Sequence, residues 1–392
     1  EDLTQAGIHP PRSGSFKVDL VTDDIAGCLG NDVVSKLHQT LNKLVIYKPR
    51  INQLNNFKRL YFERYGESEI PLLTIINELE AYGYTDLLTH SPALSRYVFG
   101  GVNKENGKSK GGWPESVLSY VLQQQEQLYV DVSVLLQDFS SNILHSSKPR
   151  DIVTWISLWE EKDVLDGEPI IEIKSIGAQH PGRIMGRFAS SLPAVKNFLS
   201  EYDGNDNALI VEIVHLPEDR IGNICGRPKL SEYEIRIRSG GSSSSNSISV
   251  DDLMVSVINN RVLLRSRKLN RYLSIRMSNA HSFDRPQSLP LYRFLNHLVN
   301  QDDYIESLSL RTAYPDAQFM PGIVCDNLII SRPSWLINNE DISLLRRGGK
   351  IERVNIFNSW RVKRNYPSWV TFVQGDNVIP YNLDNEWMLD DL

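Results

Sequence analysis

The stretch "LMVSVINNRVLLRSRKLNRYLSIR", residues 253–276, decides the expected fold. Apolar and polar side chains alternate through three short runs, and a period of two is typical of half-buried β-strands. The runs are separated by Asn259-Asn260 and by Lys268-Leu269-Asn270, and asparagine accepts the backbone conformations that tight turns require. The stretch therefore predicts three consecutive antiparallel strands.

The chain before this stretch has a helical character. Apolar residues recur every three or four positions, which is the period of an amphipathic helix, and Gly66 is a typical residue after a helix end. We expect a helical part at about residues 28–148, preceded by a short strand "FKVDLVTDD". The predicted helices cover residues 31–47, 51–66 and 69–84, with a longer helical stretch at 115–144.

The second part of the chain, at about residues 169–385, is predicted to be rich in strands. A helix at "LPLYRFLNHLVNQ" interrupts it, and "GGSSSSNS" reads as a flexible loop. The fold class is therefore α+β: N-terminal helices followed by a mixed, mainly antiparallel sheet with interspersed helices. Further strands are expected at residues 169–177, 207–217, 232–241, 322–331 and 368–383, the last with a turn at Gly375-Asp376-Asn377.

Composition excludes several classes of protein. The chain has 392 residues, a hydrophobic fraction of 41% and a net charge of −6, so the whole molecule is not a basic nucleic-acid binder. It has neither an apolar run long enough to span a membrane nor a signal pattern at its start. Cys28, Cys225 and Cys325 lie far apart, which speaks against a zinc site or a disulfide framework. We expect a cytoplasmic protein without a metal or other cofactor.

Basic residues are concentrated in two regions. Residues 220–276 contain eleven basic side chains against four acidic ones, and residues 332–364 contain eight against three. Such regions on an acidic protein can form a local face that binds phosphates. The alternative interpretation is that they are the solvated faces of alternating strands.

Common catalytic motifs are absent from the sequence. There is no G-x-x-x-x-G-K-[ST] loop, no strand–G-x-G-x-x-G–helix unit and no G-x-S-x-G elbow. The chain therefore shows no signature for activating a substrate with a nucleotide. If the protein forms an acyl bond, the acyl group has to arrive already activated.

Two segments combine arginine with glycine, proline or asparagine. The first, "GAQHPGRIMGRFAS", presents Arg183 and Arg187, and its glycines allow close approach of a substrate to the backbone. The second, "LPEDRIGNICGRPKLSEYEI", presents Arg220, Asn223 and Arg227. Arginine forks bind carboxylates and phosphates, although solvated corners of a strand–loop connection have the same composition.

Seven blocks of the chain resemble class I lanthipeptide dehydratases, in the order found in that family. The two arginine segments are similar to its "G…GRF" and "LP…NV…RP…YEI" blocks, and "FKVDLVTDD" is similar to its "DL" strand. The resemblance spans residues 16–385. The other blocks are "FKRLYFERYGESEIPLLTIINE", "LPLYRFLNHLV", "PGIVCDNLIISRPSWLI" and "YPSWVTFVQGDNVIPYNLDN".

The resemblance implies a tRNA-dependent reaction. The N-terminal region of these dehydratases transfers glutamate from glutamyl-tRNA to Ser and Thr hydroxyls of a precursor peptide, and a separate C-terminal domain eliminates it to leave dehydroalanine or dehydrobutyrine. Residues 1–392 are thus expected to be a partial glutamylation domain, with glutamyl-tRNA as co-substrate. A tRNA ester is a preactivated acyl donor, which agrees with the absent nucleotide motifs.

The resemblance also implies roles for single residues. Arg187 matches the arginine of "GRF" and is expected to bind the glutamyl carboxylate or a terminal phosphate. Asp19 matches the "DL" carboxylate and is expected to orient the amine or serve as a base, unless it is a strand-end carboxylate paired with an arginine. The residues expected to bind substrate or tRNA are Arg183, Arg220, Asn223 and Arg227; for Asn223 and Arg227 a structural role in a turn is the alternative.

The sequence also departs from the family's pattern. It contains no "R..TPFG" motif, no leader-binding domain and no elimination domain. We therefore expect a fragment or one part of a split system, with the missing halves as partners beside the precursor peptide and glutamyl-tRNA, and a homodimer as an option. The alternatives are a non-catalytic scaffold that binds tRNA or peptide, an inactive relative, and an enzyme that appends another amino acid.

Overall fold

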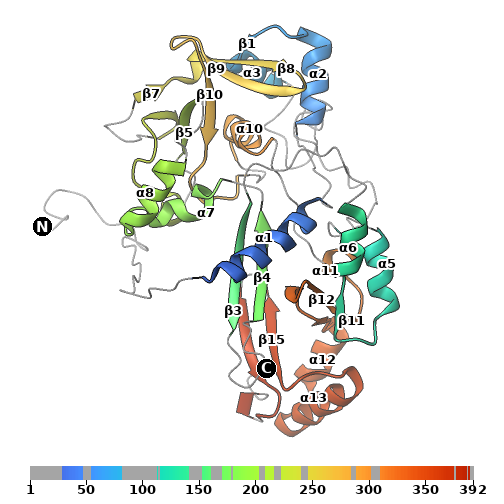
Figure 1. Cartoon of the computed structure of the whole chain (residues 1–392). Helices are drawn as coiled ribbons and strands as arrows, with labels where there is room; N and C mark the ends of the chain where they lie inside the picture. Colours follow the sequence, from blue (N-terminus) through green and yellow to red (C-terminus); the bar gives the residue numbers. More distant parts are fainter. Residues whose placement is uncertain are drawn as a thin grey trace, which may run out of the picture. The chain divides into compact units, whose positions relative to one another are not determined.

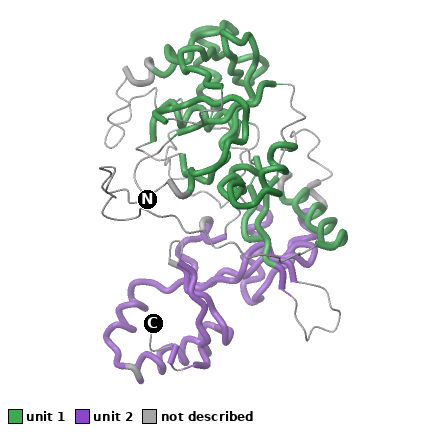
Figure 2. Tube along the Cα trace, turned by 90° about the vertical axis from the view of Figure 1, so that its left-hand side faces the viewer, with its two compact units in different colours: residues 1–108, 139–157, 173–308 green, residues 109–138, 158–172, 309–392 purple. Residues whose placement is uncertain are grey.

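The computed structural model of the chain divides into two compact units (Figure 2). Unit 1 comprises Glu1–Lys108, Phe139–Ser157 and Ile173–Leu308, and unit 2 comprises Ser109–Asp138, Leu158–Glu172 and Ser309–Leu392. Each unit thus combines segments that are far apart in the sequence. The structure describes residues 29–46, 54–81, 113, 115–140, 152–159, 170–177, 180–202, 208–215, 222–239, 246–283, 288–301, 310–374, 377–385 and 387–388.

Unit 1 is built on a seven-stranded sheet with the order β1-β8-β9-β10-β5-β6-β7. The half from β1 to β10 is antiparallel, and the half from β10 to β7 is parallel. The strands are β1 (Ile70–Pro71), β5 (Leu209–His215), β6 (Tyr233–Ile237), β7 (Asn246–Ile248), β8 (Leu253–Ile258), β9 (Arg261–Ser266) and β10 (Arg271–Arg276).

The three antiparallel strands predicted for residues 253–276 are confirmed as β8, β9 and β10. Asn259 and Asn260 have φ values of 50° and 59°, and Asn270 has a φ of 51°. Positive φ at both central residues is the geometry of the tight hairpin turn that suits the twist of a sheet. Asparagine tolerates this geometry better than other residues with a side chain. The turn residues themselves therefore favour these turns, without help from distant parts of the chain.

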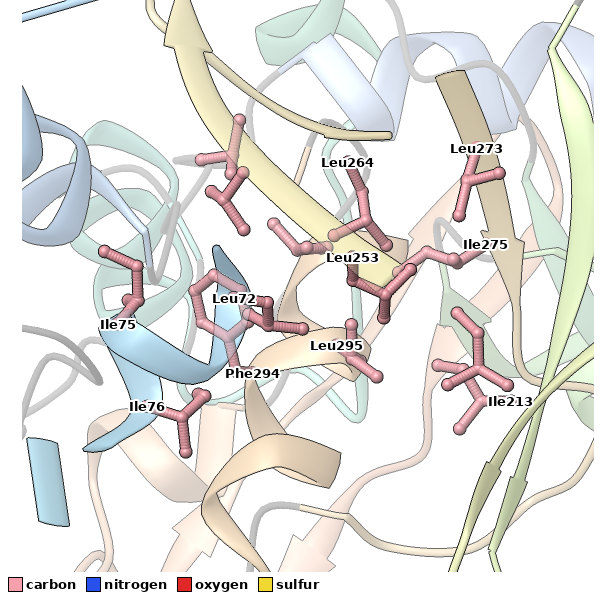
Figure 3. Close-up of a cluster of buried hydrophobic side chains, with 14 of the residues drawn as sticks. Leu72, Ile75, Ile76, Ile213, Leu253, Leu264, Leu273, Ile275, Phe294 and Leu295 are labelled. Carbon is pink, nitrogen blue, oxygen red and sulfur yellow. The ribbon is translucent and has the colours of Figure 1, made fainter. Parts of the chain in front are cut away.

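Three helices of unit 1 contribute side chains to the core that also contains one face of this sheet (Figure 3). In β8, β9 and β10, the residues at alternate positions are buried. These side chains pack against leucine, isoleucine and phenylalanine side chains from the helices. The helices are α2 (Asn55–Tyr65), α3 (Leu72–Ala81) and α10 (Pro290–Val299). Unit 1 also contains α1 (Asn31–Ile46), α7 (Gly182–Met185), η2 (Gly186–Phe188), α8 (Pro193–Tyr202), α9 (Gly222–Cys225) and η4 (Val250–Asp252).

Tyr61 connects α2 to the sheet through a hydrogen bond. Its buried hydroxyl lies 2.7 Å from the carbonyl oxygen of Val255 in β8 and 2.8 Å from that of Ser68, so it donates to either acceptor. Burial raises the pKa of Tyr61 to about 12, and the phenol stays protonated as a donor at neutral pH. The helix ends at Gly66, whose φ of 59° confirms the expected glycine end.

A second sheet has the order β2-β12-β13-β4-β3, whose strands are labelled in part in Figure 1. The boundary between the units falls within β3 and β4, so residues 158–159 and 170–172 of these strands belong to unit 2 together with β2, β12 and β13. Asp326 and Asn327 form the turn between β12 and β13, both with positive φ. Two smaller sheets pair β11 with β14 and β15 with β16. The strands are β2 (Tyr129–Asp131), β3 (Val153–Trp159), β4 (Ile170–Gly177), β11 (Phe319–Met320), β12 (Gly322–Cys325), β13 (Leu328–Ser331), β14 (Ser334–Trp335), β15 (Trp369–Gln374) and β16 (Asn377–Asn382).

The continuous helical stretch predicted for residues 115–144 is wrong. The helix α5 (Glu115–Gln123) ends early, β2 follows, and α6 (Ser133–Ser140) is a separate helix. Parallel pairing of β2 with β12 overrides the local helical pattern, and Asp131 accepts hydrogen bonds from the backbone and hydroxyl of Ser133 at the start of α6. Residues 141–144 lie outside the described part of the chain.

Several elements were not predicted. The basic region at residues 332–364 contains two helices, α12 (Asn339–Arg347) and α13 (Lys350–Arg364), and α11 (Leu310–Ala313) precedes them. The strand β3 was also missed, and part of the expected flexible loop at residues 240–247 forms β7. The predicted strand "FKVDLVTDD" and the turn residues Gly375 and Asp376 lie outside the described residues. The predicted α+β class with mixed sheets is confirmed.

The start of α12 is stabilised by an ion pair with the end of α13. The side chain of Asn338 accepts a hydrogen bond from the backbone of Asp341, and Asp341 accepts one from the backbone of Asn338. Both oxygens of the Asp341 carboxylate also accept from the Arg364 guanidinium, at 2.6 and 3.0 Å. These hydrogen bonds to Arg364 hold the pKa of Asp341 below its usual value.

The ion pair predicts how the stability of unit 2 depends on pH. Because the pKa of Asp341 is lower in the folded state, its contribution is fully present above the pKa of the unfolded chain and is lost as the pH falls below that value. We expect Asp341→Asn to lower the free energy of unfolding by about 1–3 kcal/mol at pH 7, and by progressively less below about pH 4. Thermal unfolding of both proteins between pH 7 and pH 3 measures this difference.

The matched control is Asp384→Asn, which removes the half-exposed ion pair with Arg361 in the same unit. Solvent screens an exposed pair, so this variant should change the unfolding temperature much less than Asp341→Asn does. Equal effects of the two variants at pH 7 would contradict the prediction.

Candidate functional site

The glycine- and arginine-rich segment folds into two short helical turns. Pro181 precedes α7, and η2, which contains Arg187, directly follows α7. Proline suits this position because its fixed φ matches a helical start. The segment therefore presents Arg183 and Arg187 from consecutive turns of a compact backbone instead of from an open loop.

Gly182 and Gly186 allow this backbone to rest on Ser278, which follows β10. A β-carbon at Gly182 would lie 2.8 Å from both Nδ1 of His180 and Oγ of Ser278. A β-carbon at Gly186 would overlap the carbonyl oxygen of Ser278, which is backbone and cannot rotate away. Both glycines thus make room for Ser278, and the interpretation that they also make room for a substrate stays a prediction.

Ser278 is held by the carboxylate of Glu212 in β5. The Ser278 backbone N–H donates to Oε1 of Glu212 at 2.7 Å, and its hydroxyl donates to Oε2 at 2.9 Å. Both residues are almost completely buried. Since a buried carboxylate is stable only when its oxygens are hydrogen-bonded, this bidentate contact fixes the backbone after β10 relative to β5.

Arg227 is the counter-ion of the same carboxylate. Its Nη2 lies 2.7 Å from Oε1 of Glu212 and also donates to the carbonyl oxygen of Ile213 at 2.9 Å. The Arg227 side chain is only 8% exposed. These contacts favour the structural role that the sequence left open for Arg227, while its role in substrate binding stays a prediction.

The structure separates the two arginines of the segment. The guanidinium carbon of Arg183 lies 5.0 Å from the ring centre of Phe283, which is itself buried. The guanidinium of Arg187 lies 4.9 Å from the ring centre of Phe188, which is 39% exposed. Stacking on an aromatic face restrains a guanidinium without using its hydrogen-bond donors. Arg187 therefore combines a restrained orientation with a solvent-exposed neighbour.

A buried polar cluster lies close to Arg183 and Arg227. The Tyr292 hydroxyl lies 3.0 Å from Nδ1 of His281, and burial raises its pKa. Burial likewise raises the pKa of the Cys225 thiol, partly offset by the charge of Arg227. Because the thiolate is the nucleophilic form, a buried thiol with a raised pKa is a poor nucleophile at neutral pH.

The remaining predicted site residues cannot be placed side by side with these. Asp19 and Arg220 lie outside the described residues, as does Cys28. Asn223 lies in α9, and the structure describes its backbone only. Of the predicted residues, the described structure thus places Arg183 and Arg187 in one segment. Arg227 pairs with Glu212, whose carboxylate also binds Ser278, the residue on which that segment packs.

Many arginines of the two basic regions are engaged within the protein. In unit 1, Arg265 pairs with Glu69 and Arg236 with Glu234; in unit 2, Arg332 pairs with Glu172. Arg361 and Arg364 pair with Asp384 and Asp341. Ion-paired arginines are less available for a nucleic-acid backbone, so the phosphate-binding face stays a prediction that rests on fewer side chains than the composition suggests.

Sequence reasoning missed Glu212 and Ser278. The available signal was the position of Glu212 within the apolar run "ALIVEIVH", because glutamate is almost never fully buried unless it is paired. A glutamate in the middle of a buried strand therefore predicts a cationic partner. Nothing in the sequence identifies that partner as Arg227 or places Ser278 beside it.

The fold of the chain is similar to part of two solved proteins. It is similar to the crystal structure of the tRNA-dependent lantibiotic dehydratase MibB from Microbispora sp. 107891, with a TM-score of 0.71 and 18% identity over 92% of this chain and 36% of that chain. It is also similar to the glutamylation domain TbtB from thiomuracin biosynthesis, with a TM-score of 0.61 and 16% identity over 92% of this chain and 44% of that chain. A second structure of TbtB, bound to 5'-phosphodesmethylglutamycin, gives a TM-score of 0.62 at 16% identity, over 92% of this chain and 45% of that one.

The chain belongs to the lantibiotic dehydratase family. The family model "Lantibiotic dehydratase, N terminus" matches residues 2–392, which confirms the resemblance seen in the sequence blocks. The chain spans less than half the length of the solved relatives. No curated protein matches it. Among the helices of the described residues, none is both long and apolar enough to cross a membrane.

The close packing of Gly186 on Ser278 predicts the effect of a single methyl group. Gly186→Ala places a β-carbon against a backbone oxygen that only a backbone shift can move, and we expect it to lower the free energy of unfolding by about 1–3 kcal/mol. Gly182→Ala meets side-chain atoms of His180 and Ser278, which have some freedom to rotate, and should cost less. Thermal or denaturant unfolding of both variants measures the difference.

Hydrogen exchange of the peptide covering residues 180–190 provides the second measurement. Exchange should accelerate in Gly186→Ala, because the segment no longer rests on Ser278. An unchanged unfolding temperature together with unchanged exchange would show that the packing is looser than the structure indicates.

Proposed function

We propose that the chain is the part of a lantibiotic dehydratase that transfers glutamate from glutamyl-tRNA to Ser and Thr hydroxyls of a ribosomal precursor peptide. The observation that carries the proposal is membership of the dehydratase family across residues 2–392. The similarity of the fold to a domain described as a glutamylation domain supports it. The dehydroamino acids would then arise by elimination of the glutamate.

In this proposal the protein supplies position and charge, not activation. The ester of glutamyl-tRNA is already activated, so the site has to hold the acyl group, neutralise its charge and accept the proton of the attacking hydroxyl. No step requires a cofactor beside the aminoacyl-tRNA. The leaving group is the 3'-terminal hydroxyl of the tRNA, and the new bond is an ester to the peptide.

Arg187 is the proposed anion-binding residue of the site. Its guanidinium stacks on Phe188, which is 39% exposed, while the guanidinium of Arg183 lies over the buried Phe283. A guanidinium can bind a carboxylate or phosphate through two parallel hydrogen bonds. Asp19 is proposed as the base or the group that orients the amine, on the family resemblance alone.

Arg187→Ala tests the role of this residue. In the full-length protein supplied with radiolabelled glutamyl-tRNA and the precursor peptide, we expect kcat/KM for transfer to fall by about 100- to 1000-fold, as for the loss of a charged group that stabilises the reacting anion. Arg187→Lys should recover only a small part, because a lysine cannot form the bidentate contact. Mass spectrometry of the peptide identifies the glutamyl adduct.

The matched control is Arg59→Ala on α2, which removes an exposed arginine paired with Glu63 and should leave transfer unchanged. If Arg187→Ala transfers at the rate of Arg59→Ala, the chain acts as a scaffold that binds tRNA or peptide. If the wild type uses tRNA charged with another amino acid and not glutamyl-tRNA, the protein is a relative that appends that amino acid, and the proposed reaction is wrong.

A further inference from the structure

We propose that Glu212 is a positioning residue for Arg187. Its carboxylate holds Ser278, and Ser278 in turn sets the place of the η2 backbone from which Arg187 projects. The inference rests on the proposed function for its kinetic readout, and a second readout measures the position of the segment without any substrate.

The first step of the argument is the contact between η2 and Ser278. Gly186 lies so close to the Ser278 carbonyl oxygen that a β-carbon there would overlap it unless the backbone moved, and Gly182 packs against the Ser278 hydroxyl. Two points of contact, four residues apart, define both the height and the tilt of the short helical segment. A displacement of Ser278 therefore moves the backbone at Arg187.

The second step is the contact between Ser278 and Glu212. Ser278 lies beyond the last residue of β10, where the ladder of β-sheet hydrogen bonds to β5 has ended at Arg276 paired with Glu212. Beyond this point the Glu212 carboxylate connects the chain to β5, because it accepts hydrogen bonds from both the N–H and the hydroxyl of Ser278. Glu212 is thus the anchor between the sheet and the segment.

The third step concerns Arg227, which neutralises the anchor. Its Nη2 lies 2.7 Å from the oxygen of Glu212 that also accepts the Ser278 N–H. Because the arginine and the serine share this oxygen, Arg227 orients the carboxylate toward Ser278. Arg227 thereby acts on the segment through Glu212.

A simple Glu212 variant would leave Arg227 as an unpaired buried cation and could fail to fold. The experiment therefore compares two double variants of the full-length protein, and both lack the cation and any direct role it has in binding substrate. The reference is Glu212→Gln/Arg227→Leu, whose amide oxygen can still accept the Ser278 N–H. The test variant is Glu212→Leu/Arg227→Leu, which abolishes the contact with Ser278. Thermal unfolding verifies that both variants are folded at the assay temperature.

The substrate-free readout is hydrogen exchange of the peptide covering residues 180–190. We expect exchange in this peptide to be at least tenfold faster in the Leu/Leu variant than in the Gln/Leu variant, and exchange in the Gln/Leu variant to remain within about threefold of that in the wild type. Unchanged exchange in the Leu/Leu variant would overturn the inference.

The kinetic readout is glutamyl transfer. A displacement of about 1 Å at a binding group lowers the rate by as much as 100-fold, so we expect kcat/KM to fall about 10- to 100-fold in the Leu/Leu variant. The loss should appear in the same parameter, kcat or KM, that Arg187→Ala changes. Adding Arg187→Ala to the Leu/Leu variant should then cause little further loss, since both changes remove the same interaction. Fully multiplicative losses would show that Glu212 acts elsewhere.

Asp252→Asn is the matched control for general destabilisation. Asp252 is an equally buried carboxylate in η4, directly before β8, and it accepts hydrogen bonds from the hydroxyl of Ser266 at the end of β9 and from the backbone of Lys268 before β10. This variant should leave the exchange of residues 180–190 and the transfer rate unchanged. If Asp252→Asn changed the exchange and the transfer rate as much as the Leu/Leu variant does, the effect of Glu212 would be one of general stability and not of positioning. Altered exchange with no transfer in the wild type would leave the positioning intact and contradict the proposed function instead.

Discussion

A carboxylate in the middle of a buried strand has to be neutralised and hydrogen-bonded, and at Glu212 the groups that do so organise the whole candidate site. Ser278 supplies two donors and Arg227 supplies the charge. Removing one partner of such a buried pair typically costs about 3–5 kcal/mol, because the other charge is left uncompensated. The segment that carries Arg183 and Arg187 rests on the same serine. The position of the arginines therefore depends on an interaction that contains neither of them.

The same arrangement recurs in both units. Glu172 in β4 pairs with Arg332, and Glu234 in β6 pairs with Arg236, so three glutamates within predominantly apolar strands each have an arginine partner. These pairs account for part of the basic surplus that the sequence shows in its two regions. The composition of those regions consequently overstates the positive charge that is available for binding an anion.

Local chemistry explains which elements were predictable. Asn259 and Asn260 accept the positive φ of a hairpin turn, and Gly66 ends α2, so these features follow from the residues themselves. The break at β2 was not predictable, because β2 exists through pairing with β12, whose residues lie almost two hundred positions further along the chain. The helix α12 was not predicted, although Asn338 and Asp341 form a capping box at its start and the sequence therefore contained a local signal for it.

The sequence by itself determined the α+β class, the hairpins of the seven-stranded sheet and the family, while the role of Arg187 stays a prediction. The position of Glu212 within an apolar run also indicated that this carboxylate has a cationic partner. Only the tertiary structure showed that Gly182 and Gly186 pack against Ser278. It also showed that Arg183 and Arg187 stack on different aromatic rings and that Arg227 pairs with Glu212. The physical reason is that the glycines and Arg227 are defined by contacts with Ser278 and Glu212. Those contacts join residues far apart in the chain, and neither hydrophobic period nor turn chemistry encodes such a pairing.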